Sequence, residues 1–208
     1  FISKLPLLCL FLTLPASGVV IYRTSDIRIG NILADPPYVR SFLMDVNNDG
    51  ITDWTIGTHS TQYFSDMRVV APPTTLFIYR TGKVLLNEFT PLSIDDPIDP
   101  ILGNPDYRLL NITDAFSNAL ATSSIDGGFG GPFSGKTAYL GFRFEAATGS
   151  HYGYALLQEV TSSSAIITAY AWESEPDTAI LAGAIPEPSA ALLLTVTRLL
   201  ALTKRRRT

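Results

Sequence analysis

Cysteine is almost absent from this sequence of 208 residues, because Cys9 is its only thiol. A single cysteine cannot form a disulfide within the chain, nor can it supply the several thiolates that a structural zinc site needs. Histidine is nearly as scarce, since only His59 and His151 are present. The fold must therefore be stabilised by its apolar core, and any metal site would have to use oxygen ligands.

Positive charge is scarce in the middle of the chain. Six of the 15 Lys and Arg residues lie near the ends, at Lys4, Arg198 and 204–207. Residues 19–185 carry the other nine, against 18 Asp and Glu, which gives this part of the chain a net charge of −9. Such an acidic body repels phosphate backbones, and this excludes nucleic acid as a partner. The aromatic content of 11% also argues against intrinsic disorder.

The N-terminal segment is typical of a secretory signal peptide. Lys4 precedes an apolar run from Leu5 to Leu14, and the small residues Ala16 and Gly18 follow. The run is too short to span a bilayer as a helix. We expect residues 1–18 to be removed by cleavage after Gly18, and Cys9 to be lost with them. The alternative is a buried strand or helix at the start of the domain.

The C-terminal segment, residues 185–208, contains three features in order. Pro186, Glu187 and Pro188 form a tripeptide, Ala190–Leu202 is apolar apart from Arg198, and a basic cluster ends the chain: Lys204, Arg205, Arg206 and Arg207. This resembles the PEP-CTERM sorting signal of bacterial proteins that are processed by an exosortase. The resemblance implies export, transient insertion of the apolar segment in the inner membrane, and a cytoplasmic basic cluster. The alternative is a short amphipathic helix with a basic tail.

The body between these segments, residues 19–184, consists of short β-prone runs separated by Pro- and Gly-rich turns, and only Thr113–Leu120 reads as a short helix. Along Tyr139–Phe144, Leu140, Phe142 and Phe144 share one face, as in a half-buried antiparallel strand. The pattern predicts a single domain that is an all-β antiparallel sandwich, with a jelly roll as one topology that fits it. The ten predicted strands are Val19–Tyr22, Tyr38–Asp45, Ile51–Gly57, Met67–Ala71, Thr75–Tyr79, Lys83–Asn87, Tyr107–Ile112, Thr137–Glu145, Tyr152–Val160 and Ala165–Glu173. From Tyr139 onward the body also resembles the end of many PEP-CTERM surface proteins. Members of this group have the sorting signal in common and do not share one activity.

One stretch carries the pattern of a calcium loop. Side-chain oxygens fall at its positions 1, 3, 5 and 9, Gly50 stands at position 6 where a sharp bend is needed, and position 7 offers a backbone carbonyl. The candidate ligands are Asp45, Asn47, Asp49, Ile51 and Asp53. Position 12 is Ile56, where a bidentate Glu would stand, so we expect weak binding. The alternative is a metal-free hairpin turn at 48–50.

Other patterns carry less. Residues 130–137 match the phosphate-loop pattern letter for letter, but a strand is predicted after them where a helix is required, so we interpret the match as chance and expect no nucleotide. His151 is expected to be a polar residue at a strand end. Eight aromatic residues are assigned mainly to the core, with a sugar-stacking face as the alternative: Tyr63, Phe64, Tyr79, Tyr107, Tyr152, Tyr154, Tyr170 and Trp172.

The function that these features favour is that of an exported structural or adhesive protein of the cell surface or extracellular matrix, with one calcium ion as the tentative cofactor. Its expected partners are the export machinery, an exosortase, the membrane through the C-terminal segment, and extracellular polysaccharide. A carbohydrate-binding module acting on exopolysaccharide is the alternative. A secreted hydrolase is a third reading, because the body contains carboxylates that a fold could pair.

Overall fold

The computed structural model describes residues 18–30, 40–60, 64–80, 88–99, 107–111, 119–124 and 129–186. Throughout these ranges the regular structure is β-strand, with no helix. The predicted signal peptide, residues 1–18, lies outside them apart from Gly18, as do the predicted strand Lys83–Asn87 and the chain from Glu187 onward. The predicted all-β antiparallel sandwich is confirmed.

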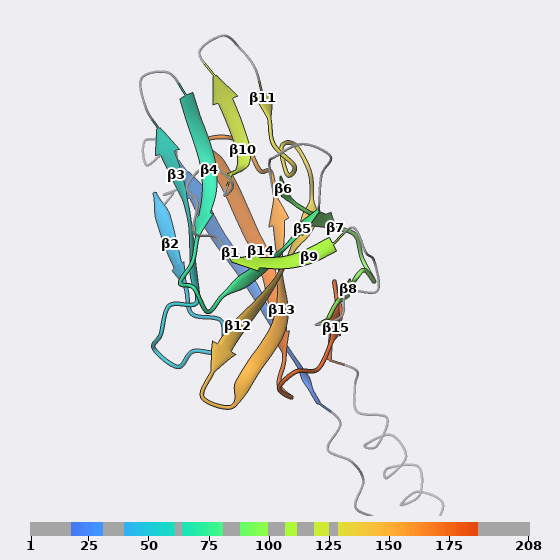
Figure 1. Cartoon of the computed structure of the whole chain (residues 1–208). Helices are drawn as coiled ribbons and strands as arrows, with labels where there is room; N and C mark the ends of the chain where they lie inside the picture. The colour runs from blue at the N-terminus through green and yellow to red at the C-terminus, as the bar shows by residue number, and fades with distance from the viewer. Residues whose placement is uncertain are drawn as a thin grey trace, which may run out of the picture.

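The larger sheet has β1, β14, β13, β12, β5 and β6 in that order, with β7 paired to β12 and β9 paired to β5. All of its pairings are antiparallel. Its strands are β1 (Val20–Gly30), β5 (Leu76–Arg80), β6 (Glu88–Phe89), β7 (Pro91–Leu92), β9 (Tyr107–Asn111), β12 (Ala138–Ala146), β13 (Gly149–Gln158) and β14 (Ser164–Glu173). Strands β12, β13 and β14 follow one another along the chain and form its centre (Figure 1).

The smaller sheet has β11, β10, β4, β3 and β2 in that order and is also antiparallel. Its strands are β2 (Ser41–Met44), β3 (Trp54–Ser60), β4 (Phe64–Val70), β10 (Ala119–Ser124) and β11 (Phe129–Gly130). A further pair, β8 (Pro97–Ile98) and β15 (Ile180–Leu181), lies beside the larger sheet.

The main core lies between the two sheets. Leu140, Phe142 and Phe144 of β12 are all fully buried in it, which confirms the predicted alternation along this strand. From the other sheet, Trp54 packs on Phe142 with ring centroids 5.6 Å apart. Burial of such rings is the main favourable term in a fold that has no disulfide among its described residues.

A second apolar cluster covers the opposite face of the larger sheet. Tyr152 and Tyr154 of β13 point to this side and are almost fully buried. The chain after β14 covers them, because Ile180 and Ala182 belong to the same cluster and the Tyr154 hydroxyl donates a hydrogen bond of 2.5 Å to the Ala184 carbonyl. The large sheet is therefore buried on both faces in its middle, as is usual when further chain packs over a sheet.

The register of β1 on β14 defines two ends of the molecule. Val20 pairs with Glu173 at one end and Gly30 pairs with Ser164 at the other. An eleven-residue strand spans about 35 Å, so these ends are far apart. The first and last described residues, Gly18 and Pro186, both lie at the Val20 end, at the bottom of Figure 1. We call this the terminal end, and the end at Gly30 the distal end.

Three expectations about the elements need correction. The predicted helix Thr113–Leu120 is wrong where it can be checked, because Ala119 and Leu120 begin strand β10, and the rest lies outside the described residues. The strand expected from Ile51 begins only at Trp54, since the preceding residues form a loop. The first strand runs well past Tyr22 to Gly30, because pairing with β14 extends it beyond what its own sequence pattern indicates.

Candidate functional site

The residues of the predicted calcium loop lie together between β2 and β3, which pair directly up to Met44 and Trp54. The connection is thus a nine-residue loop, 45–53, rather than a tight turn centred on residues 48–50. Asn48 and Gly50 have positive φ angles of 62° and 88°, which Asn and Gly tolerate best. These two residues bend the chain back on itself.

Side-chain oxygens fold inward onto the backbone of this loop. The Asp45 carboxylate accepts hydrogen bonds from the N–H groups of Asp49 (3.0 Å) and Gly50 (2.8 Å). The Asp49 carboxylate accepts one from the Ile51 N–H at 2.8 Å and another from the Asn47 amide at 2.9 Å. Each carboxylate oxygen still has acceptor capacity, because an oxygen can accept more than one contact.

Asp53 closes the loop from the inside. Only 5% of the residue is exposed, and its carboxylate accepts a hydrogen bond of 2.7 Å from the Val46 N–H. Burial raises the pKa of Asp53 to about 6, against the effect of the Val46 hydrogen bond, and the charges of Asp49 and Asp45 raise it further. The loop therefore concentrates negative charge, and no basic side chain among the described residues forms an ion pair with its carboxylates.

The donor set fits calcium in kind and falls short in number. Carboxylate, amide and backbone carbonyl oxygens are the hard ligands that calcium prefers. Ile56, at the position of the bidentate ligand, is fully buried in the core and supplies none. Within the described ranges, no three Asp, Glu, His or Cys side chains converge as a metal centre, so a bound ion would depend also on Asn47 and the Ile51 carbonyl.

The phosphate-loop match lies in an unsuitable context. Gly130 ends the short strand β11, residues 132–135 form a turn, and Thr137 leads directly into strand β12. Phosphate binding by this motif needs the N-terminus of a helix at that point. Pro132, Lys136 and Thr137 instead line an open cavity of about 800 Å³ beside β7.

His151 has a structural role. It is 4% exposed and stacks on Phe144, with ring centroids 5.6 Å apart. Its Nδ1 donates to the Glu173 carbonyl at 2.8 Å, and its Nε2 accepts from the Thr148 hydroxyl at 2.7 Å. Of the eight aromatic residues assigned mainly to the core, Tyr79, Tyr152, Tyr154 and Trp172 are buried, Tyr170 is partly buried, and the side chains of the other three lie outside the described set.

The distal end contains a polar cavity that sequence reasoning missed. Its volume is about 470 Å³, and it lies where the two sheets approach each other. Gly30 and Arg40 line it, together with His59 near the end of β3. Its other lining residues carry hydroxyl groups: Thr58, Ser60, Ser65, Ser162 and Ser163. They are far apart in sequence and of common types, so no motif could have revealed the cavity.

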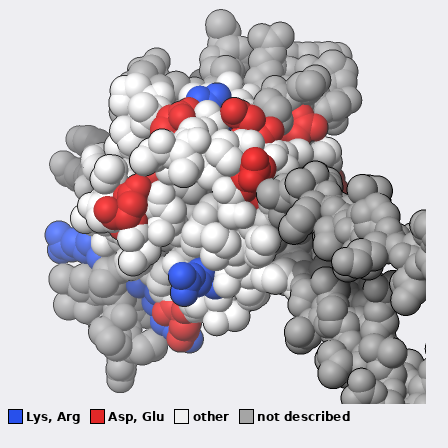
Figure 2. Space-filling view, turned by 90° about the horizontal axis from the view of Figure 1, so that it is seen from below, with Lys and Arg blue, Asp and Glu red and all other residues white. Residues whose placement is uncertain are grey.

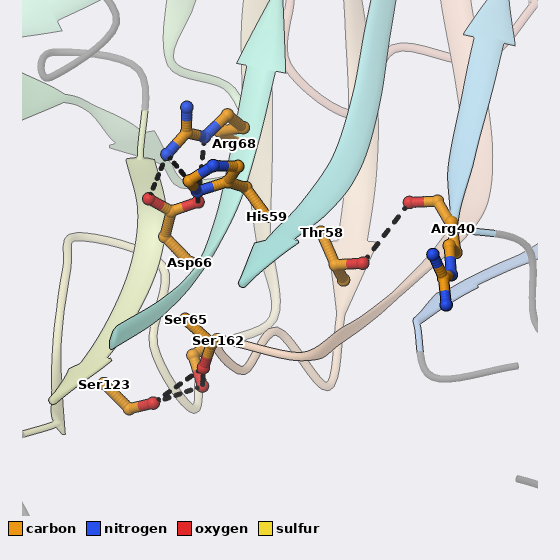
Figure 3. A network of polar contacts seen from close by, with 8 residues as sticks. All are labelled: Arg40, Thr58, His59, Ser65, Asp66, Arg68, Ser123 and Ser162. Atoms are coloured by element: carbon orange, nitrogen blue, oxygen red, sulfur yellow. Dashed lines mark hydrogen bonds and ion pairs between the residues drawn. The ribbon is translucent and has the colours of Figure 1, made fainter. Parts of the chain in front are cut away.

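Beside this cavity, an ion pair neutralises the carboxylate of Asp66 (Figure 3). Arg68 binds both oxygens of Asp66, through Nε at 2.8 Å and through one terminal nitrogen. The same guanidinium contacts His59 Nδ1 at 2.9 Å. Because arginine can only donate, Nδ1 accepts and the neutral ring carries its proton on Nε2. A Ser-His-Asp triad needs the opposite tautomer, with Nδ1 donating to the carboxylate, and Asp66 lies 3.8 Å away.

Three serine hydroxyls form a closed triangle beside the cavity. Ser65 belongs to β4, Ser123 to β10 and Ser162 to the β13–β14 turn, and their Oγ atoms lie 2.9, 3.2 and 2.9 Å apart. Ser162 is 6% exposed. The triangle fixes the turn between β13 and β14 against the smaller sheet and gives the cavity a rigid polar wall.

Comparison with known proteins gives no match to a protein-family model, a curated protein or a solved structure. Among the described residues, no helix is long and apolar enough to cross a membrane. Of the residues of the predicted sorting signal, Pro186 alone is described, and it is exposed shortly after the packed segment that ends at Ala184.

Proposed function

We propose that this chain is an exported bacterial protein of the cell envelope or extracellular matrix, with a structural or adhesive role. An N-terminal secretory segment would deliver it, and an exosortase would process it at Pro186, Glu187 and Pro188. The sequence features at both ends of the chain support this proposal. The mature body would then be thiol-free, which suits an oxidising compartment.

The observation that carries the proposal is the position of the two ends of the folded body. The backbone of Val19 exchanges hydrogen bonds with Ser174, and the Ala184 carbonyl is bonded to Tyr154 in the apolar cluster that Val20 also contacts. Both targeting segments are therefore attached at the terminal end (Figure 1). A body held this way would project its distal end away from a membrane.

Replacement of Pro186, Glu187 and Pro188 by alanine tests the proposal. In a host that contains an exosortase, we expect the wild-type chain to lose its C-terminal segment and the variant to keep it, as measured by the intact mass of the product. Glu175 and Pro176 provide a matched control, because they form a similar Glu-Pro pair within the body, and their replacement should leave processing unchanged. Equal processing of all three chains would refute the proposal.

We also propose that the 45–53 loop binds one calcium ion weakly, as extracellular modules do at about 10⁻⁴–10⁻³ M. The inward carboxylates of Asp45 and Asp49 and the buried Asp53 support this, because a divalent cation would offset their mutual repulsion. The ion would contribute rigidity to the connection between β2 and β3.

Thermal unfolding with and without calcium tests this second proposal. At 10 mM calcium a Kd of this size gives a stabilisation of about 1.5–3 kcal/mol, or several degrees in Tm, relative to EDTA. Asp49→Ala should abolish the rise, whereas Asp26→Ala, which changes an exposed carboxylate on β1, should retain it. Identical wild-type curves with calcium and EDTA would leave the loop as a metal-free turn.

A further inference from the structure

The distal cavity differs in charge from the rest of the molecule. Residues 19–185 carry 18 carboxylates, yet none of those that the structure describes lines this cavity. The nearest, Asp66, is 5% exposed and bound at both oxygens by Arg68. Figure 2 shows several acidic side chains, with basic ones among them, on the opposite, terminal end. The cavity is thus a local positive site on an acidic body.

Arg40 supplies that positive charge from a fixed backbone position. Its carbonyl accepts a hydrogen bond of 2.9 Å from the Thr58 N–H. Gly57 permits this approach, because a Cβ there would lie 2.9 Å from the Arg40 carbonyl oxygen. No ion pair found among the described residues involves the Arg40 guanidinium. An arginine of this kind is suited to two-point binding of a carboxylate.

The remaining wall of the cavity is rich in hydroxyl groups. Ser65 and Ser162 already donate within the serine triangle, and the Thr58 hydroxyl donates to the Arg40 carbonyl at 3.5 Å, so these three groups can accept hydrogen bonds from a ligand. Ser60 and Ser163 add hydroxyls that can donate or accept. Such a wall matches a ligand that carries several hydroxyls of its own. Among the described residues that line the cavity, the His59 imidazole is the sole aromatic ring, so these residues offer little of the stacking that favours neutral sugars and bases.

We propose that this cavity binds a sugar acid, a monosaccharide unit that carries both a carboxylate and several hydroxyls. The carboxylate would bind Arg40, and the sugar hydroxyls would bind the serine and threonine wall. A volume of about 470 Å³ lies within the range of small-molecule sites and accommodates one or two such units. The proposal goes beyond export and display, and its test does not depend on either.

Isothermal titration calorimetry on the full chain, with glucuronate as the probe, tests the proposal. For a ligand of this size we expect a Kd of about 1 mM, weakened by added salt. Glucose, which lacks the carboxylate, should bind at least about tenfold more weakly, because it loses the contact with the guanidinium. Inorganic phosphate, which lacks the sugar hydroxyls, should also bind more weakly than glucuronate.

Two pairs of variants locate the binding. Arg40→Gln should weaken glucuronate binding about tenfold or more, whereas Arg23→Gln, at an exposed arginine on β1 outside the cavity, should not. Ser60→Asp should abolish binding by adding a negative charge to the exposed rim, whereas Ser60→Asn should retain it. Because residues 40 and 60 are both exposed, these variants should keep the wild-type Tm.

Three results would overturn the proposal. The first is no heat of binding with glucuronate at concentrations up to about 20 mM, which is 20-fold above the expected Kd. The second is an affinity for glucose or phosphate equal to that for glucuronate. The third is an unchanged affinity for glucuronate in Arg40→Gln. The second result would reassign the cavity to a simpler ligand, and the third would place the binding elsewhere on the molecule.

Discussion

Glu145 illustrates how one side chain joins two neighbouring strands at the terminal end. It lies opposite Ser150 across the β12–β13 hairpin, and its carboxylate accepts a hydrogen bond of 2.7 Å from the Ser150 hydroxyl and another from Arg143. Partial burial raises the pKa of Glu145, but the bonds from Ser150 and Arg143 and the charge of Arg143 outweigh burial and hold it below its usual value. The ionised form is therefore the one that the folded state favours.

This lowered pKa predicts a pH-dependent contribution to stability. A carboxyl group whose folded-state pKa is depressed stabilises the fold above its unfolded-state pKa, here near 4.5, and the contribution disappears as the pH falls through the folded value. We expect Glu145→Gln to lower the free energy of unfolding by up to about 1 kcal/mol at pH 7, because the group is partly exposed. The difference from wild type should close between pH 5 and pH 3 in urea unfolding.

Ser150→Ala is the matching variant for this prediction. It removes only the hydroxyl donor, so it should show a smaller loss at pH 7 that closes over the same range of pH. A difference between wild type and Glu145→Gln that stays constant down to pH 3 would contradict the assignment.

Single residues also mark how far the sequence could predict the candidate sites. Asp45, Asn47, Asp49 and Asp53 were predictable because they lie within nine residues and follow a pattern tied to one chemistry. Arg40 was not, because its role comes from a cavity formed with residues of β3 and of the β13–β14 turn. Tertiary proximity of this kind leaves no local pattern in the sequence.

At the scale of elements, the segment after β14 is the least obvious part of the fold. Ala182 exchanges backbone hydrogen bonds with Asp95 and Asp96, and Ile180 pairs with Ile98. This segment covers the outer face of β13 and is secured near its end by the Tyr154 hydroxyl. It connects the folded body to Pro186 and thus to the proposed sorting signal.

Removal of that hydroxyl should loosen this segment. Tyr154→Phe deletes the hydrogen bond to the Ala184 carbonyl while keeping the ring, so we expect a loss of about 1 kcal/mol in the free energy of unfolding. Amide hydrogen exchange should accelerate at residues 180–184 and stay unchanged in β12.

Tyr139→Phe provides the control for this prediction. The Tyr139 ring packs edge-on against Tyr154, with centroids 5.2 Å apart, and its hydroxyl makes no hydrogen bond recorded for the described residues. Its exchange pattern should match wild type. Equal acceleration in both variants would mean that ring packing, and not the Tyr154 hydrogen bond, holds the segment.

Some strands can be predicted from their sequence patterns and others cannot. Alternation along β12 is clear because Leu140, Phe142 and Phe144 face the core while Tyr139 and Arg143 do not. Strand β13 has no such alternation, since residues on both of its faces are buried. The two-residue strands β6, β7, β8, β11 and β15 are too short to show any period, and pairing with their neighbours alone defines them.

For the whole molecule, the two ends of the sandwich have different chemistry. The terminal end holds the attachment points of both proposed targeting segments and bears acidic side chains with basic ones among them (Figures 1 and 2). The distal end holds the polar cavity with Arg40, and none of the described residues that line it is a carboxylate. A chain anchored through its C-terminal segment would thus present the cavity outward, where a soluble ligand can reach it.

This orientation predicts different accessibility at the two ends in the anchored protein. Ala147 is exposed in the β12–β13 turn. This turn lies at the terminal end, because Gly149, which follows it, approaches Pro176, and the Asp177 N–H donates a hydrogen bond to the Ser150 carbonyl. Ser163 is exposed at the distal end next to Gly30. Ala147→Cys and Ser163→Cys, each in a Cys9→Ser background, place one thiol at each end. In spheroplasts that carry the chain with its Pro186, Glu187 and Pro188 replaced, a bulky maleimide should label Ser163→Cys several-fold faster.

A small maleimide serves as the control for intrinsic reactivity, because membrane crowding hinders it far less than a bulky one. With it, the two thiols should react at similar rates, since both positions are exposed turns. If the bulky reagent labels Ala147→Cys as fast as Ser163→Cys, the terminal end does not face the membrane. The two ends would then be equally open to solvent, and the distal cavity would gain no advantage in access from the way the chain is held.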